Sequence, residues 1–211
     1  MLSDVLWRFG PLFLHKKNKN EQVRDYILRR LPHGAVAAEI GVRRGDFSAK
    51  TLRIAEPRRL HLIDPWIADP HDQHRERPGN TLPVLTYADP EGDYQSVLKR
   101  FAAEISAGVV QTHRQFSADA VTSFEDNYFD WVYVDGNHEY EYVKADLELY
   151  YPKLKPGGLF LCNDYNFSLY WGDGVNRAVD EFVAKGFCTK VYQRRFEYVM
   201  RKPRAPRAQA A

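Results

Sequence analysis

The stretch Phe129-Asp130-Trp131-Val132-Tyr133-Val134-Asp135-Gly136-Asn137-His138-Glu139-Tyr140 decides how the chain folds. Residues 131–134 are aromatic or β-branched, which is typical of a short buried strand. Asp135-Gly136 is a turn pair, and a helical pattern begins after it. Open α/β sheets bind their ligands where strands end, so an acid there with a histidine three residues later indicates a functional site. The alternative is an ordinary turn in which Asp135 caps the next helix, and the rest of the chain argues against it.

Strand and helix patterns alternate on both sides of this stretch. Four more buried strands are expected at 35–40, 59–63, 109–113 and 159–162, and two closing strands at 189–193 and 197–201. Repeated alternation of strands and helices implies a doubly wound α/β sheet. We therefore expect a Rossmann-like, seven-stranded sheet, mostly parallel with an antiparallel last strand.

Length, charge and cysteine content limit the kind of protein this is. A chain of 211 residues suits one domain with a sizeable core. The formal net charge of +2 is too small for a strong nucleic-acid footprint. Cys162 and Cys188 do not make a disulfide framework, which fits a reducing compartment. No stretch approaches the ~20 apolar residues of a membrane span, and the N-terminus lacks a signal-peptide pattern. These features predict a cytoplasmic protein without a membrane span or a nucleic-acid partner.

The chain has two expected appendages. Residues 1–34 are predicted to form an N-terminal helical extension to a main domain at 35–201, and the Pro-, Arg- and Ala-rich residues 202–211 a disordered tail. Residues 1–20 are dense in apolar side chains, which usually cover the same domain or a second subunit. On this basis we expect a homodimer.

Residues 67–93 are expected to form a lid-like loop. They contain four prolines and almost no periodicity, and loops this long in a compact domain are usually functional or disordered. His71 and His74 lie within them, where a solvated, substrate-facing loop is favoured over a metal site.

The strand at 35–40 leads into a glycine-containing turn. The pattern is Glu39-x-Gly41-x-x-x-Gly45, which differs from the dinucleotide-binding pattern G-x-G-x-x-G. Such a turn lets the backbone approach a ligand closely and aims the N-terminus of the next helix at it. Asp64 ends the second strand 23 residues after Gly41, about where nucleotide-binding units place the acid that accepts from ribose hydroxyls. A surface acid that begins a loop is the alternative.

The ends of the other strands also carry polar residues. Ser117 to Asp119 follow the third strand, Asp135 the fourth, and Asn163-Asp164 the fifth. The first three strand ends together suit a nucleoside. The oxygen ligands of the last two suit a hard cation such as Mg²⁺, and no cysteine and histidine set has zinc spacing.

Five motifs carry a family resemblance. They are Glu39-Ile40-Gly41-Val42-x-x-Gly45-x-Phe47-Ser48, Ile63-Asp64, Val134-Asp135-Gly136-x-His138-x-Tyr140, Leu154-Lys155-Pro156-Gly157-Gly158 and Asn163-Asp164-Tyr165. With these motifs the sequence resembles class I S-adenosylmethionine-dependent O-methyltransferases of the macrocin O-methyltransferase and cephalosporin-hydroxylase-like group. The resemblance spans residues 35 to about 185, and D-G-x-H-x-Y followed by K-P-G-G is its most specific part.

The resemblance implies which residues bind the cofactor. Gly41 and Gly45 would line the methionine end of S-adenosylmethionine, Asp64 would bind the ribose, and Ser117-Ala118 would edge the adenine. The complete expected set is Glu39, Gly41, Val42, Gly45, Phe47, Ser48, Asp64, Trp66, Ser117, Ala118 and Asp135.

The resemblance also implies a metal site and a base. Asp135, Asn163 and Asp164 fall on the positions that bind Mg²⁺ in metal-dependent relatives, although Asn163 replaces an acid found in some of them. His138 would be the general base, and it would act with Asp135. An unperturbed imidazole pKa near 6.5 suits proton abstraction at ambient pH.

The implied acceptor is a hydroxyl of a sugar or of a glycosylated metabolite, since macrocin-type relatives methylate sugars. A narrower expectation is a mannose-containing oligosaccharide, as in methylmannose-polysaccharide 1-O-methyltransferases. Trp66, Tyr165, Tyr170 and Trp171 offer aromatic surface for a sugar, and core packing explains each about as well.

Three alternatives to a sugar O-methyltransferase remain. The first is an O-methyltransferase of a small aromatic or polyketide hydroxyl. The second is a non-catalytic nucleoside-binding module, which would have no use for Asp135, His138 and Asp164 together. The third, an iron hydroxylase, would want two histidines, and only His138 lies at an expected strand end.

Overall fold

The computed structural model describes residues 18–67, 89–168 and 172–204. Within these ranges seven strands form one sheet in the order β3-β2-β1-β4-β5-β7-β6. The strands are β1 (Val36–Ile40), β2 (Arg59–Ile63), β3 (Val110–His113), β4 (Phe129–Val134), β5 (Leu154–Cys162), β6 (Thr189–Arg194) and β7 (Glu197–Arg201). β1 to β5 pair in parallel, and β7 runs antiparallel to both of its neighbours. The predicted α/β sheet is confirmed.

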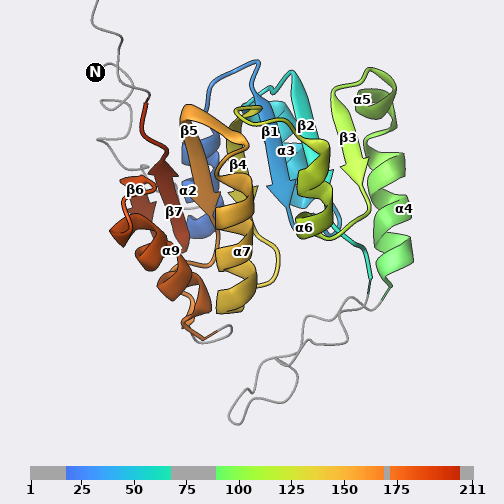
Figure 1. The fold of residues 1–211 in the computed structure, drawn as a ribbon. Coiled ribbons are helices and arrows are strands. Elements are labelled where there is room, and N and C mark those ends of the chain that lie inside the picture. The colour runs from blue at the N-terminus through green and yellow to red at the C-terminus, as the bar shows by residue number, and fades with distance from the viewer. Residues whose placement is uncertain (1–17, 68–88, 169–171, 205–211) are drawn as a thin grey trace, which may run out of the picture.

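Helices cover both faces of the sheet (Figure 1). In the view of Figure 1, α2 and α3 lie behind the sheet, and α6, α7 and α9 lie in front of it. The bounds are α2 (Lys19–Leu28), α3 (Asp46–Ile54), α4 (Pro90–Arg100), α5 (Ala102–Ser106), α6 (Ser117–Ala120), the 3₁₀ turn η2 (Val121–Ser123), α7 (Tyr140–Tyr150) and α9 (Gly174–Ala184).

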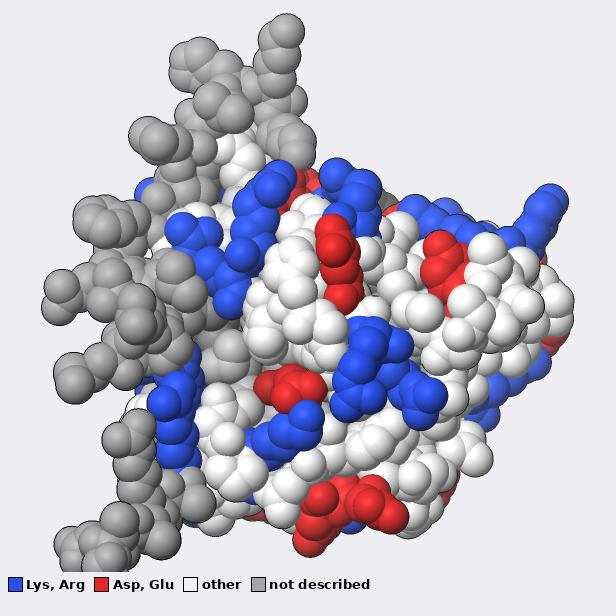
Figure 2. All heavy atoms as spheres, turned by 90° about the horizontal axis from the view of Figure 1, so that it is seen from above, with Lys and Arg blue, Asp and Glu red and all other residues white. Residues whose placement is uncertain are grey.

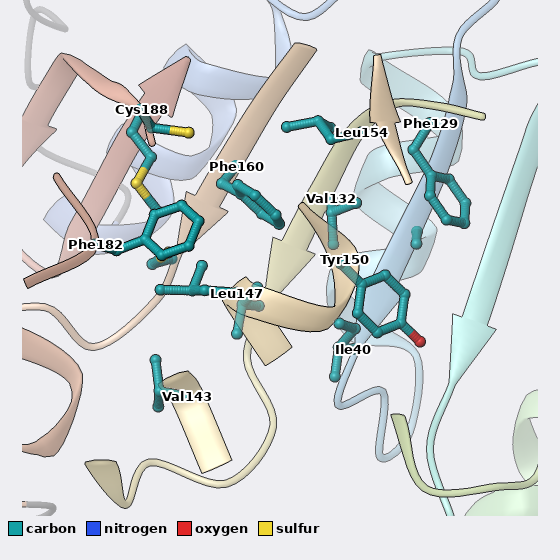
Figure 3. Packing of buried hydrophobic residues seen from close by; sticks show 14 of the residues in the cluster. Ile40, Phe129, Val132, Val143, Leu147, Tyr150, Leu154, Phe160, Phe182 and Cys188 are labelled. Carbon is teal, nitrogen blue, oxygen red and sulfur yellow. The ribbon is translucent and has the colours of Figure 1, made fainter. Parts of the chain in front are cut away.

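The core has two halves because β4 alternates its side chains between the faces. Trp131 and Tyr133 pack with α2 and α3, whereas Val132 and Val134 pack with α7 and α9. Figure 3 shows the second half, with α7 side chains such as Leu147 against the sheet. Burial of one such large apolar side chain stabilises the fold by roughly 1.5–3 kcal/mol.

Helix α2 is part of the core. Its residues Val23, Ile27 and Leu28 are buried and belong to the same cluster as Trp131. The chain therefore begins to pack before residue 35, where the main domain was expected to start. That boundary stays a prediction, and the apolar residues 1–17, on which the expected homodimer depends, lie outside the described residues.

The fifth strand was expected at 159–162, but Lys155-Pro156-Gly157-Gly158 also belong to it. α7 ends at Tyr150, and these four residues lie inside β5. The extension has a physical cause, because Gly157 N–H donates to the carbonyl of Lys202 and Lys202 N–H donates to the carbonyl of Gly158. The first residue of the expected tail thus pairs with β5, and residues 205–211 lie outside the described residues.

A lid-like loop was expected at 67–93, but residues 90–93 belong to a helix. α4 begins at Pro90, and the Asp89 carboxylate accepts from Gly92 N–H as its N-cap. Asp followed by Pro is a recognisable start of a helix. It was missed because the prolines of this stretch favour a loop. Residues 68–88, with His71 and His74, lie outside the described residues.

Smaller expectations can also be compared with the structure. Cys162 and Cys188 are both free, as expected, and both are buried. Among the described residues, no helix combines the length and the apolar character that crossing a membrane requires.

The edge of the sheet where the parallel strands begin has mixed charge. Figure 2 looks onto this edge and shows basic side chains in separate groups with acidic ones between them. Two of the contacts there are ion pairs, Lys153 with Asp126 and Lys155 with Asp130. This pattern agrees with the small net charge, and the absence of a nucleic-acid partner stays a prediction.

Gly41 marks the closest approach between the chain leaving β1 and the chain leaving β4. Its φ is +85°, in the left-handed region that favours glycine. A Cβ atom on Gly41 would lie 2.1 Å from the carbonyl oxygen of Asp135. Because that oxygen belongs to the backbone, a side chain at position 41 would push the two strand ends apart.

Gly41→Ala should therefore destabilise the protein more than Gly34→Ala. At Gly34, φ is +66° and no atom lies within 4 Å of an added Cβ, so only backbone strain of roughly 1–2 kcal/mol is expected. The clash at Gly41 should add about 1–3 kcal/mol to that loss. Urea unfolding of the two variants measures the difference, and equal losses would contradict the close approach.

Candidate active site

The predicted site residues lie at one edge of the sheet. Ile40 pairs with both Ile63 and Val134, and Val134 pairs with Cys162, so β1, β2, β4 and β5 end side by side. The residues that follow these strand ends include Gly41, Asp64, Asp135 and Asn163, and Ser117 begins α6 shortly after β3. This is the lower edge in Figure 1, to which the arrowheads of β1, β3 and β5 point.

Asp135, His138 and Asp164 form a compact cluster. His138 Nε2 lies 3.0 Å from Asp164 Oδ2 and 3.6 Å from Asp135 Oδ1. One potential ligand atom from each residue lies within 4.8 Å of the others, which is close enough for all three to bind one metal ion. Asp164 has φ +56°, a left-handed conformation that aspartate adopts more readily than most residues. The expected convergence of an acid after β4 with an acid after β5 is thus present.

The two carboxylates control the protonation of His138. Burial lowers the pKa of the imidazole, but hydrogen bonding and charge from Asp135 and Asp164 outweigh burial and raise this pKa to about 9. In this arrangement His138 holds its proton at neutral pH and bridges the two acids. The pKa of His138 is therefore higher than the value near 6.5 that was expected for an unperturbed imidazole. This holds as long as no cation binds to the two carboxylates.

Asn163 lies beside the cluster with its amide in a defined orientation. Its Nδ2 donates to Asp135 Oδ1 over 2.7 Å, and its Oδ1 accepts from Arg24 Nη2 over 2.9 Å. The amide oxygen thus points to Arg24 and away from Asp135. Metal binding through Asn163 stays a prediction.

Asp64 holds the glycine turn after β1. Its Oδ2 accepts from the N–H groups of Val42 and Arg43, each over 2.9 Å, and its Oδ1 accepts from Trp66 N–H over 2.7 Å. The indole of Trp66 is buried and donates to the carbonyl of Arg43, over 2.8 Å. Both predicted cofactor residues therefore shape the turn, and their direct contact with a ligand stays a prediction.

Glu39 lies buried beneath this turn. Burial raises the pKa of its carboxyl well above the usual range, and the neighbouring Ser48 only partly opposes this. Glu39 Oε2 has no hydrogen-bond partner among the described residues. Phe47 stacks on Tyr133 with ring centroids 3.9 Å apart. Glu39, Phe47 and Ser48 are thus gathered around the first turn of α3.

Ser117 meets an acid that sequence reasoning missed. Its hydroxyl donates to Asp146 Oδ1 over 2.5 Å, and Tyr150 donates to its carbonyl. Burial raises the pKa of Asp146 to about 7, against the opposing effect of Ser117. Asp146 lies on the inward face of α7 with Val143 and Tyr150, and a charged residue on an apolar stripe was the available signal. Ala118 is exposed next to this contact.

Tyr165 is half-buried and contacts its neighbours through its hydroxyl and its ring. Its hydroxyl donates to Asp180 over 2.9 Å, and its ring lies 4.6 Å from that of Tyr198. Trp66 is buried, so two of the four aromatic residues considered for sugar stacking have packing roles. Tyr170 and Trp171 lie outside the described residues.

Sequence comparison identifies the family. The family model described as a methyltransferase domain matches residues 38–165, which include the glycine turn and the whole acid cluster. The chain belongs to this family. No curated protein matches the methyltransferase chain in sequence.

Solved structures share the fold of this methyltransferase. An O-methyltransferase from Bacillus cereus in complex with SAH has a TM-score of 0.61 and 12% identity, covering 92% of this chain and 84% of that chain. An O-methyltransferase from Streptomyces achromogenes involved in tomaymycin synthesis, in complex with SAM, has a TM-score of 0.59 and 18% identity, covering 91% and 82%. A putative caffeoyl-CoA O-methyltransferase from Staphylococcus aureus has a TM-score of 0.59 and 13% identity, covering 92% and 86%. Identities this low establish a common fold alone.

Asp64→Asn should lower the stability of this methyltransferase domain. An asparagine has one acceptor oxygen for three backbone N–H groups, and its amide protons would face donors. Hydrogen bonds to a charged group contribute about 1.5–3 kcal/mol each, so we expect a loss of about 2 kcal/mol in the free energy of unfolding. Urea unfolding measures it, with Asp119→Asn as the control because Asp119 is exposed at the same edge. Equal stability of the two variants would show that the Asp64 carboxylate does not hold the turn.

Proposed function

We propose that this methyltransferase is an S-adenosylmethionine-dependent O-methyltransferase that uses Mg²⁺ and acts on a hydroxyl of a sugar or glycosylated metabolite. The observation that carries the proposal is the cluster of Asp135, His138 and Asp164 at the sheet edge that also bears the Gly41 turn. Methylation of a hydroxyl needs a binding site for the cofactor and a base close to the hydroxyl. The Gly41 turn would provide the first, and His138, which lies between two acids, would provide the second.

The residues around Gly41 fit S-adenosylmethionine. Lack of a side chain at Gly41 lets the turn after β1 lie against the backbone of Asp135, at the edge that holds the acid cluster. The buried Glu39 carboxyl, with its unpartnered Oε2, lies below the same turn and would ionise when a cationic group reached it. S-adenosylmethionine carries an ammonium and a sulfonium group, and two of the similar folds were solved with SAM or SAH. When bound, it supplies an electrophilic methyl group.

The acid cluster fits a divalent cation. Asp135 and Asp164 offer carboxylate oxygens, which Mg²⁺ prefers, and His138 lies next to both of them. When bound, the cation would lower the pKa of an acceptor hydroxyl. Asp135 and Asp164 would hold it from two neighbouring strand ends.

We assign His138 as the general base for the acceptor hydroxyl. Asp135 and Asp164 orient its ring through Nε2. A cation on the same carboxylates would neutralise the charge that holds the imidazole proton, leaving His138 able to accept the proton of the hydroxyl. When bound, S-adenosylmethionine would supply its methyl group to this oxygen and leave as S-adenosylhomocysteine, while His138 would keep the proton.

The sugar acceptor rests on the resemblance to macrocin-type enzymes, and a vicinal diol would suit bidentate binding. A mannose-containing oligosaccharide is the narrower choice. A small aromatic hydroxyl is the second candidate, because one of the similar folds is a putative caffeoyl-CoA O-methyltransferase. We also propose a cytoplasmic homodimer, on composition and on the apolar N-terminus.

The protein should release S-adenosylhomocysteine when incubated with S-adenosylmethionine, Mg²⁺ and mannose-containing oligosaccharides. His138→Ala should lower kcat by about 10²–10⁴-fold, because a positioned base contributes that much. Its affinity for S-adenosylhomocysteine by calorimetry should not change. His33→Ala is the control, since His33 is exposed in the turn before β1, at the opposite edge.

Three results would contradict parts of the proposal separately. No calorimetric binding of S-adenosylhomocysteine would contradict the cofactor. Full turnover in excess chelator would contradict the cation. Turnover of catechols but not of saccharides would move the acceptor to the aromatic class.

A further inference from the structure

Arg24 connects the N-terminal helix α2 to the acid cluster. Its Nη2 donates to Asn163 Oδ1 over 2.9 Å, and its Nε donates to Glu197 Oε1 over 2.8 Å. Asn163 in turn donates to Asp135 Oδ1 over 2.7 Å. One guanidinium therefore joins α2, β7 and the residue after β5, and it lies two hydrogen bonds from Asp135.

The chemistry of the three groups fixes the direction of this chain of hydrogen bonds. A guanidinium only donates, and an ionised carboxylate only accepts. An amide between them must turn its oxygen to Arg24 and its nitrogen to Asp135, as the structure shows. An Asn163 that gave its oxygen to a cation at Asp135 would lose both hydrogen bonds.

Arg24 is itself held in place from two sides. Glu197 is buried and accepts from Arg24 and, more weakly, from the hydroxyl of Tyr133, at 3.3 and 3.4 Å. The guanidinium carbon of Arg24 lies 5.9 Å from the centroid of Phe47, which stacks on Tyr133. A guanidinium that donates to two partners inside the protein has little freedom to move, whereas a lysine ammonium would have more.

We propose that Arg24 is a positioning residue for the cation site: it fixes Asn163 as a hydrogen-bond donor to Asp135, so that Asn163 orients the cation-binding carboxylate and does not bind the cation. This inference rests on the proposed function, and it assigns to α2 a part in the site. Outer groups that orient metal ligands typically change metal affinity by 10–100-fold when they are replaced.

The test is Mn²⁺ binding by Arg24→Lys, measured by calorimetry on the full chain. Lysine keeps the positive charge next to Glu197 but cannot donate to Glu197 and Asn163 in the fixed geometry of a guanidinium. We expect Mn²⁺ affinity to fall by about 10-fold and affinity for S-adenosylhomocysteine to stay unchanged. Arg30→Lys is the control, because Arg30 follows the same helix and contacts Tyr26, remote from the cluster.

The opposite role for Asn163 predicts the opposite result. If the Asn163 oxygen were a ligand, Arg24 would compete for it, and Arg24→Lys would bind Mn²⁺ more tightly. Unchanged or tighter binding therefore overturns the inference and leaves the proposed function standing. No Mn²⁺ binding by the wild type overturns the inference together with the cation part of the proposed function, while S-adenosylhomocysteine binding still reports on the cofactor part.

A double-mutant cycle tests whether Arg24 acts through Asn163. Asn163→Ala leaves the Arg24–Glu197 pair in place and should also weaken Mn²⁺ binding by about 10-fold. In that background Arg24→Lys should have no further effect, because the residue through which it acts is gone. Additive effects would overturn the inference, and normal Mn²⁺ binding by Asn163→Ala overturns it even if Arg24→Lys does not fold.

Discussion

The close contact between Gly41 and the backbone of Asp135 is the constraint on which the site depends. Gly41 N–H donates to the carbonyl of Ile63, and Asp135 N–H donates to the carbonyl of Ile40, so three strand ends are linked at this point. The left-handed φ of Gly41 turns the chain away immediately afterwards. This brings the acid after β4 beside the glycine turn after β1. Asp64 then holds the turn in place with its carboxylate.

Buried acids dominate the electrostatics of this region. Burial raises the pKa of Glu39 well above its usual range and the pKa of Glu197 to about 7. Asp135 and Asp164 share His138, and Glu197 contacts Arg24. A site rich in acids with few resident cations favours positively charged ligands. S-adenosylmethionine, with its sulfonium group, and a divalent metal ion are both positively charged. Both therefore suit the charge of this site.

The centre of the sheet was predictable from sequence because β1, β2 and β4 are mostly buried and read as apolar runs, as in 131–134. Acids that directly follow such runs, including Asp64 and Asp135, were predictable for the same reason. The strand at Lys155-Pro156-Gly157-Gly158 was not, since its partner is Lys202, 44 to 47 residues later, and Pro and Gly read locally as a turn. Arg24 and Glu197 were missed because their meeting depends on the packing of α2 against β7. The direction of the Asn163 amide likewise depends on that meeting.

Hydrogen exchange with and without S-adenosylhomocysteine tests most directly whether the edge containing Gly41 binds S-adenosylmethionine. Backbone amides that contact a ligand or are stabilised by it exchange more slowly. We predict slower exchange in residues 41–48, 64–66 and 117–120, with little change in β6 and β7 at the far side of the sheet. Unchanged exchange in 41–48 under saturating ligand, or protection confined to other segments, would contradict it.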